Sequence, residues 1–410
     1  MISRRQFLRS SSSAAMLASI SGLPQILRAA PQAESELGKV KIIDVKTATI
    51  RFRYDMHLVK VITDSGVYGI GEAYNRAGVL DHIQSIKRQI IGQDPLMVDV
   101  LTQKMFDSGV GQGSHSGSLT GAIAGIETAL WDVAGKILNV PVYMLLGGRF
   151  RDKILLYHDT GSPNTVDPKP WLEEAEKTKH FGFRATKFDL NPFGGERWNR
   201  AIPSEDLKAW IGILEAIRDY LGPDFPLGVD FHWKLNTHDA KQFVDMARHL
   251  NLWFVEDPMP PGNADAFARL TAASPIPIAT GENLFTRQTF RPYIEQQACD
   301  IIQPDTQKCG GLLETKRIAD WADLYYLNML CHNMCSPVGT IASGHACMAI
   351  RSFVALESDS VEIPDWQHVV QWDGPLYKDG YLEIPNKPGL GIELNEDVCR
   401  KHLAPGSRLF

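Results

Sequence analysis

The sequence is poor in cysteine, has no strong excess of positive charge and lacks a long apolar run. Six cysteines in 410 residues are too few for a disulfide scaffold, and no CxxC pair or Cys/His cluster has zinc-binding spacing. We therefore interpret the cysteines as small buried residues. The formal net charge of −6 argues against a nucleic-acid partner. Because 18 uninterrupted apolar residues occur nowhere, we expect no membrane span.

The first 30 residues differ from the rest of the chain, since they contain four arginines and no acidic residue. Residues 3–8 read SRRQFL, and a weakly apolar stretch of Ser, Ala, Met, Leu and Ile follows up to residue 20. This combination is typical of a twin-arginine export signal. A disordered basic tail is the alternative interpretation. We expect residues 1–33 to be the signal and the mature protein to be periplasmic in a bacterium.

The pattern of residues 39–152 predicts an α+β domain. Two segments rich in Val, Ile and Thr predict strands, with Asp64-Ser65-Gly66 as a hairpin turn. Apolar residues at helical spacing then predict three helices, and Gly147-Gly148-Arg149 marks the end of the domain. The predicted strand segments and helices are Val40–Arg53, Leu58–Ile70, Leu80–Ile91, Pro95–Met105 and Gly121–Leu138.

Short apolar runs that end in polar residues recur eight times after residue 150. From the third run onward, the polar ends are 23 to 27 residues apart, which is the length of one strand plus one crossover helix. Eight such units close into a (β/α)8 barrel. The runs are Ile154–His158, Ala185–Asp189, Pro226–His232, Leu252–Asp257, Ile276–Glu282, Cys299–Asp305, Tyr326–His332 and Phe353–Glu357.

Three acidic residues, Asp230, Glu256 and Glu282, end three successive predicted strands. All strands of such a barrel end at one mouth, so the three carboxylates converge there. Clustered anions repel strongly in an apolar setting, and a hard divalent cation with oxygen ligands relieves that repulsion. A single acid at a strand end is more often a helix cap, but three in register predict a Mg²⁺ site.

Two histidines are predicted at the same mouth. His332 ends the seventh run beside Asp305, which ends the sixth, and a carboxylate that fixes the imidazole tautomer makes the ring a general base. His232 lies two residues after Asp230, so strand alternation predicts that its side chain enters the same mouth. A loop histidine that caps the next helix is the alternative for His232.

These motifs resemble the enolase superfamily, mandelate racemase subgroup, from Lys39 to the C-terminus. The resemblance implies an α+β capping domain (39–152), a modified TIM barrel of (β/α)7β type (153–376) and a C-terminal segment (377–410) that returns to the capping domain. The matching motifs are VDFH (229–232), FVEDP (254–258), TGEN (280–283), QPD (303–305), CH (331–332), IETALWDVAGK (126–136) and LLGG (145–148).

The family reaction begins with removal of the proton α to a carboxylate, and the resemblance implies two further site residues. Lys187 matches the first lysine of the second-strand motif, and Glu357 matches the eighth-strand glutamate that donates a hydrogen bond to the intermediate. Racemases of the family have Lys-x-Lys where this chain has Lys187-Phe188-Asp189, so a second amine base is missing. Asp189 is instead a candidate to bind a substrate hydroxyl.

The resemblance to galactonate dehydratases in this subgroup makes His232 the acid that protonates a leaving β-hydroxyl. We therefore expect a Mg²⁺-dependent dehydratase, with a small-molecule sugar acid as substrate and galactonate favoured. An epimerase or cycloisomerase of sugar acids, and an exported member that binds sugar acids without catalysis, are the alternatives. The family also tends to form homo-oligomers. Loops of the capping domain read the distal end of the substrate, and the polar candidates there are Arg53, His57, Tyr74 and Arg76.

Overall fold

The computed structural model describes residues 38–109, 115–193, 201–372 and 374–410. The predicted export signal lies outside these residues. Within them, no helix combines the length and the apolar character needed to cross a membrane.

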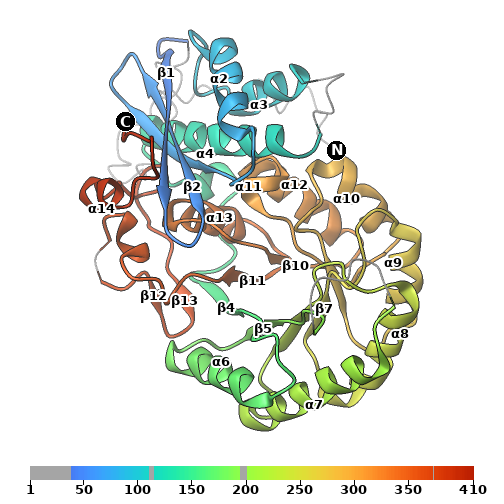
Figure 1. Ribbon diagram of the computed structural model, residues 1–410. Helices are drawn as coiled ribbons and strands as arrows, with labels where there is room; N and C mark the ends of the chain where they lie inside the picture. Colours follow the sequence, from blue (N-terminus) through green and yellow to red (C-terminus); the bar gives the residue numbers. More distant parts are fainter. Residues whose placement is uncertain (1–37, 110–114, 194–200, 373) are drawn as a thin grey trace, which may run out of the picture.

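The N-terminal domain is an antiparallel sheet with three helices against it (Figure 1). The strands lie in the order β1 (Ile42–Arg51), β2 (Asp55–Thr63), β3 (Tyr68–Ala73), and the predicted turn joins β2 to β3. All three predicted helices are present to within a few residues at each end. They are α2 (Val79–Ile90), α3 (Val98–Asp107) and α4 (Ser118–Leu138).

Glycines let β3 lie directly on α4. A Cβ atom at Gly69 would meet the carbonyl oxygen of Ala129 at 2.0 Å, and one at Gly71 would meet that of Gly125 at 2.3 Å. Any side chain at these two positions would push the sheet away from the helix. The close approach fixes β3, which carries a buried acid, Glu72, toward the second domain.

The second domain is a closed barrel of eight parallel strands, as the spacing predicts. The strands are hydrogen-bonded in chain order, and a pairing between the last strand and the first closes the ring. They are β4 (Ile154–Thr160), β5 (Thr186–Asp189), β6 (Leu227–Asp230), β7 (Phe254–Glu256), β8 (Ile278–Thr280), β9 (Ile301–Ile302), β10 (Asn328–Cys331) and β11 (Phe353–Ser358). Each strand lies within its predicted run or overlaps it.

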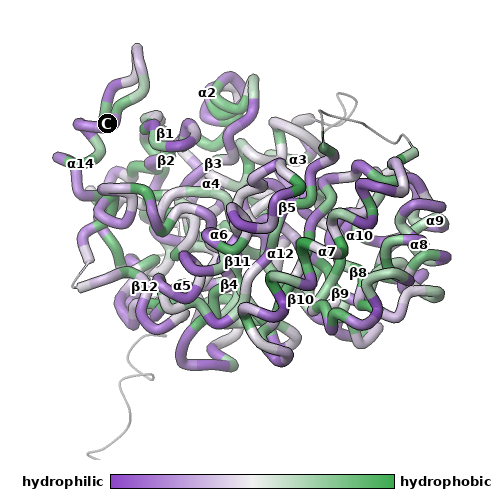
Figure 2. Tube along the Cα trace, turned by 60° about the horizontal axis from the view of Figure 1, so that its bottom comes forward, coloured by the Kyte–Doolittle hydropathy of each residue, from purple (hydrophilic) through white to green (hydrophobic). Residues whose placement is uncertain are grey.

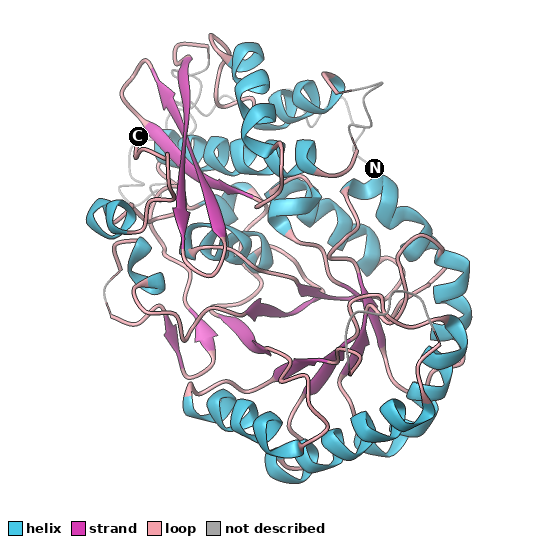
Figure 3. Cartoon of the chain, in the orientation of Figure 1, coloured by secondary structure: helices cyan, strands magenta, loops and turns pink. Residues whose placement is uncertain are grey.

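Helices surround the strands (Figure 3) and occupy all seven connections between β4 and β11. Outward-facing residues of the strands pack on this layer; Phe188, for example, is buried with its ring centroid 6.2 Å from that of Trp171. Hydrophilic stretches recur along outer helices such as α8 and α9 (Figure 2). The helices are α6 (Pro168–His180), α7 (Ser204–Leu221), α8 (Thr237–Met246) with the 3-10 turn η2 (Ala247–Leu250), α9 (Ala264–Thr271), α10 (Thr286–Glu295), α11 (Thr306–Cys309), α12 (Leu312–Asp323) and α13 (Pro337–Met348). The fold is therefore a TIM barrel of (β/α)7β type with a capping domain, joined through α5 (Val142–Leu145).

The C-terminal segment contacts both domains. It follows the turn η3 (Trp366–Val369) and begins with the hairpin β12 (Tyr377–Lys378) and β13 (Tyr381–Leu382), which pairs with β4 of the barrel. After α14 (Glu396–Lys401) the chain runs beside β1 (Figure 1). There the amide of Arg51 donates to the carbonyl of His402 at 2.7 Å, and the amide of Ala404 donates to that of Thr49 at 2.9 Å.

Candidate active site

Strand register aligns charged side chains at the mouth of the barrel. Asp159 on β4 is paired with Lys187 on β5, Asp189 on β5 with Asp230 on β6, and Asp230 with Glu256 on β7. Paired residues of neighbouring parallel strands lie side by side and point to the same face. The register therefore gathers these groups into one charged cluster at the C-terminal ends of the strands.

Lys187 is the cation at the centre of this cluster and is 2% exposed. Its Nζ lies 2.6 Å from Glu357 Oε1, 3.2 Å from Glu256 Oε2, 3.5 Å from Asp230 Oδ2 and 3.7 Å from Asp159 Oδ1. Burial by itself lowers the pKa of Lys187, but the carboxylates of Asp159, Glu256 and Glu357 outweigh it and raise this pKa well above 10.5. The lysine is thus held in its charged form.

Glu357 forms the shortest of these ion pairs, and this bears on its predicted role. Burial by itself raises the pKa of Glu357, yet Lys187 and His332 hold it below the ordinary value. The ion pair therefore favours the carboxylate, which accepts hydrogen bonds, whereas the predicted donor role needs the protonated acid.

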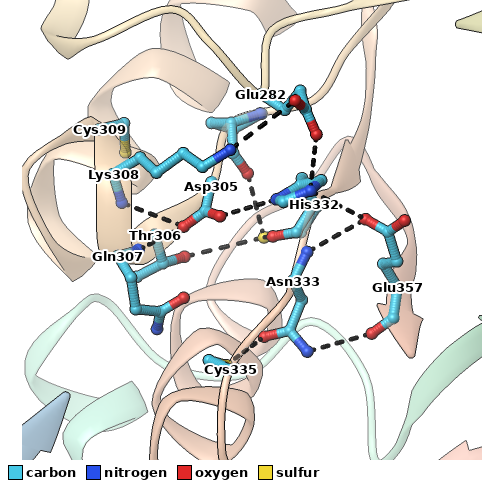
Figure 4. A network of polar contacts seen from close by, with 12 residues as sticks. Glu282, Asp305, Thr306, Gln307, Lys308, Cys309, His332, Asn333, Cys335 and Glu357 are labelled. Atoms are coloured by element: carbon cyan, nitrogen blue, oxygen red, sulfur yellow. Dashed lines mark hydrogen bonds and ion pairs between the residues drawn. The ribbon is translucent and has the colours of Figure 1, made fainter. Parts of the chain in front are cut away.

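The predicted pair of His332 and Asp305 is present (Figure 4). The two residues form a bridge between neighbouring strands, and His332 Nδ1 lies 2.7 Å from Asp305 Oδ2. The other ring nitrogen, Nε2, lies 2.6 Å from Glu282 Oε2 and 3.8 Å from Glu357 Oε2. Burial lowers the pKa of His332, but Glu282 and Glu357 raise it well above 6.5, so the ring holds a proton strongly as long as Glu282 carries no cation.

His232 also enters the site, but by a different route from the predicted one. Strand β6 ends at Asp230, so strand alternation does not orient His232. The backbone instead turns through the left-handed region at His232 (φ 45°) and Trp233 (φ 62°), a conformation that is costly for residues other than glycine. Hydrogen bonds from the amide of His232 to Asp230 Oδ1 (2.7 Å) and from Trp233 Nε1 to Asp257 Oδ2 (2.6 Å) hold this turn.

The ring of His232 faces two carboxylates. Its Nε2 lies 3.5 Å from Asp230 Oδ2, and its Nδ1 lies 3.8 Å from Asp189 Oδ1. Burial lowers the pKa of His232, but Asp230 and Asp189 produce a net rise above 6.5. The protonated form, which an acid catalyst needs, is therefore favoured.

Two of the three residues predicted to bind Mg²⁺ offer a free oxygen to a hard cation. Asp230 Oδ2 and Glu256 Oε1 are buried and accept no hydrogen bond, so two carboxylate oxygens are available for a ligand. Glu282 is shared with His332, Lys308 and Asn283. Among the described residues, a tighter group with ligand atoms within 4.8 Å of one another is Asp189, Asp230 and His232. Its imidazole nitrogen suits Mg²⁺ less well than the oxygen-only set.

A cavity of about 320 Å³ lies over these groups, between the barrel mouth and the capping domain. Three of the four loop candidates, Arg53, Tyr74 and Arg76, line it. His57 is not among its lining residues, because its ring lies in the capping sheet, 3.0 Å from Thr49 Oγ1.

Sequence reasoning missed two charged residues that line the cavity, Asp159 and Lys308. Asp159 is one residue short of the end of β4, and its Oδ1 accepts no hydrogen bond. Lys308 is 3% exposed, lies 3.7 Å from Glu282 Oε1 and places its Nζ 4.5 Å from the ring centroid of Tyr74. Asp159 directly follows the first predicted apolar run, so the sequence could have indicated it. Lys308 lies in a helix of four residues, which is too short to show a hydrophobic pattern.

Comparisons with known proteins agree with this fold. Residues 41–147 match the mandelate racemase/muconate lactonizing enzyme N-terminal domain, and residues 171–398 match the enolase C-terminal domain-like family. The chain is 39% identical over 374 residues to a D-xylonate dehydratase of Haloferax volcanii, covering 90% of each protein. It is 32% identical over 362 residues to a D-galactonate dehydratase of Cronobacter sakazakii, covering 86% of this chain and 92% of that protein.

A solved structure has the same architecture. The mandelate racemase/muconate lactonizing enzyme-like protein from Rubrobacter xylanophilus superimposes with a TM-score of 0.86 at 35% identity, over 90% of this chain and 99% of that one. Both domains are thus shared with proteins of one family. The chain therefore belongs to the mandelate racemase/muconate lactonizing enzyme family of the enolase superfamily, and it is a lyase of the dehydratase class.

Proposed function

We propose that the protein catalyses the Mg²⁺-dependent dehydration of an aldonic acid to a 2-keto-3-deoxy acid. One observation carries this proposal: two histidines that follow different strands face one cavity, each beside carboxylates, while the position of a second amine base holds Asp189. Such a site has one base for an α-proton and one acid for a leaving group.

His332 is the base of the first step. Its Nε2 takes the proton from the carbon next to the substrate carboxylate, while Asp305 accepts a hydrogen bond from Nδ1–H and holds the ring in the required tautomer. Lys187 lines the same cavity, where its charge would stabilise the negative charge that develops on the substrate oxygens. When bound by Asp230, Glu256 and Glu282, Mg²⁺ neutralises part of that charge.

His232 is the acid of the second step. It gives its proton to the β-hydroxyl, the carbon–oxygen bond breaks, and one water leaves. The resulting enol takes up a proton at the β-carbon, loses the proton of its hydroxyl group and becomes the 2-keto acid. The raised pKa of His232 supports this role, since the ring then carries the proton before the step begins.

The missing amine base at position 189 argues against racemisation as the overall reaction. A two-base racemase needs a second group that exchanges the α-proton on the opposite face. Burial raises the pKa of Asp189 to about 6, and its Oδ1 accepts no hydrogen bond. That oxygen is suited to accept a hydrogen bond from a substrate hydroxyl.

The substrate class follows from the site and the relatives together. A cation in the cavity suits a carboxylate, and the oxygens of Asp159 and Asp189 that accept no hydrogen bond suit a chain of hydroxyl groups. Two relatives are named for D-xylonate and D-galactonate. We propose a five- or six-carbon aldonate, so D-xylonate belongs beside the galactonate that the sequence alone favoured.

Two histidine variants test the mechanism. In deuterated buffer with Mg²⁺, His332→Asn should lose both α-proton exchange and formation of the 2-keto acid. His232→Asn should keep exchange and lose dehydration, because only the second step needs its proton. Equal loss of both activities in His232→Asn would contradict its role as the acid. Unchanged activity in chelated buffer would rule out the metal-dependent mechanism.

The twin-arginine signal over residues 1–33 and the homo-oligomeric state stay predictions. Export would be tested by locating the full-length protein in cell fractions with and without Arg4 and Arg5 replaced by lysine.

A further inference from the structure

Glu72, in the capping sheet, reaches into the barrel domain and is 2% exposed. Its carboxylate accepts hydrogen bonds from the amide of Ser336 (2.9 Å), from Ser336 Oγ (2.5 Å) and from the amide of Gly339 (3.0 Å). These donors lie at the beginning of α13, where helix amides have no partner within the helix. A residue of one domain thus caps a helix of the other.

Glu127, on α4 of the capping domain, caps α12 in the same way. It is fully buried and accepts hydrogen bonds from the amides of Leu312 (2.8 Å) and Leu313 (3.0 Å), the first two residues of α12. Trp131 Nε1 also donates to it at 2.6 Å. A Cβ atom at Gly311 would lie 2.2 Å from Glu127 Oε2, so a glycine is required for this contact.

The two capped helices follow the two strands of the His332–Asp305 pair. Only three residues separate His332 from Ser336 at the start of α13. Asp305 Oδ1 accepts the amides of Gln307 (2.7 Å) and Lys308 (3.0 Å), and the short helix α11 then runs directly into α12. Each member of the pair is therefore connected, through a short segment, to a helix that a capping-domain carboxylate holds.

We propose that Glu72 and Glu127 are positioning residues by which the capping domain sets the geometry of His332 relative to Asp305. This inference rests on the proposed role of His332 as the base. Neither carboxylate is among the residues that line the active-site cavity, so both act through the backbone. The contacts that dock the capping domain on the barrel then also align His332 with Asp305. A displacement of about 1 Å at a reacting group lowers the rate by about 100-fold.

Asp132 supplies a matched control for a purely structural role. It is a fully buried carboxylate on α4 that accepts backbone amides, from Ile70 at 2.9 Å and Leu390 at 2.8 Å, and it also forms an ion pair with Lys136 at 2.8 Å. Those amides belong to the capping sheet and the C-terminal segment. Its loss should therefore destabilise the fold without moving His332.

The experiment compares Glu72→Gln, Glu127→Gln and Asp132→Asn in the full-length protein, with kcat and KM measured on D-xylonate or D-galactonate, whichever the wild type dehydrates. We expect kcat to fall about 10- to 100-fold in the two glutamine variants, with KM changed less than about threefold. Asp132→Asn should lose comparable stability but keep kcat within about threefold. Wild-type kcat in folded Glu72→Gln, or an equal loss in Asp132→Asn, would overturn the proposal.

A second readout does not depend on turnover. The NMR signal of the proton between His332 Nδ1 and Asp305 should shift or broaden in Glu72→Gln and stay unchanged in Asp132→Asn; an unchanged signal in Glu72→Gln would also overturn the proposal. If the wild type itself turns over no aldonate, the proposed function fails, while this signal still decides the positioning role. If a glutamine variant does not fold, Ser336→Ala and Trp131→Phe remove single donors to the same carboxylates and should show smaller effects in the same direction.

Discussion

Replacing Lys187 by methionine tests the charge balance of the site. The substitution keeps a long apolar side chain but removes the cation that lies 2.6 Å from Glu357, 3.2 Å from Glu256 and 3.5 Å from Asp230. The remaining buried carboxylates would then repel one another with no cation between them. Breaking a buried ion pair by deleting one partner costs about 3 to 5 kcal/mol.

The assay is urea unfolding at pH 7, in chelated buffer and with Mg²⁺. The folded pKa of Lys187 is raised above 10.5, so its stabilisation is complete below that pH and is lost only as the pH rises through the folded value. We expect a loss of about 3 to 5 kcal/mol in chelated buffer, and a smaller loss with Mg²⁺, because a divalent cation offsets part of the repulsion. Activity should fall by at least about 100-fold.

Two controls accompany this variant. Lys187→Arg keeps the charge and should be less destabilised in chelated buffer. Lys401→Met removes an exposed lysine from its ion pair with Asp365 and should cost less than about 1 kcal/mol. Wild-type stability of Lys187→Met in chelated buffer would refute the reasoning, because it would mean that the carboxylates are already neutral without the lysine.

Two further predictions concern the metal and the response to acid. Glu256→Gln should weaken Mg²⁺ binding in calorimetry by at least about 10-fold, and an unchanged affinity would remove Glu256 from the predicted ligands. His345 is fully buried, with its Nδ1 3.2 Å from the amide of Tyr143 and its Nε2 3.1 Å from the carbonyl of Leu390, and burial lowers its pKa to about 4. A lowered pKa means that its stabilisation is complete above pH 6.5 and is lost as the pH falls toward 4, so wild type should lose about 3 kcal/mol relative to His345→Gln over this range in urea unfolding. Burial raises the pKa of Glu72 and Glu127 to about 7, so these two groups increase the free energy of unfolding as the pH falls. Wild type and His345→Gln share this contribution, and it therefore cancels in the difference between them.

The barrel could be predicted from the sequence because its strands are buried on both faces. Such strands are continuous apolar runs, and their regular spacing reflects one crossover helix per strand. The polar residue at the end of each run then marked the mouth, which is why Asp305 and His332 were expected together and lie together.

Contacts between segments that are distant in the sequence could not be predicted from local sequence patterns. Glu72 lies in a short glycine-rich strand, and its partner Ser336 is 264 residues away. The orientation of His232 depends on a left-handed turn that hydrogen bonds to Asp230 and Asp257 stabilise. The spacing of apolar residues does not predict either hydrogen bond. Sequence spacing identified the strands of the site, but the loops that shape its cavity depend on tertiary packing.

The pairing of β1 with the last residues of the chain has a consequence for biosynthesis. The free edge of β1 around Ile50 is covered by the segment near Leu403, which is made roughly 350 residues later. At 5 to 20 residues per second, the ribosome needs roughly 20 to 70 s to deliver that segment. An uncovered strand edge is a template for unwanted pairing with other chains. The nascent capping sheet is therefore vulnerable to aggregation until that segment has been made, and removal of the segment should prolong that state indefinitely.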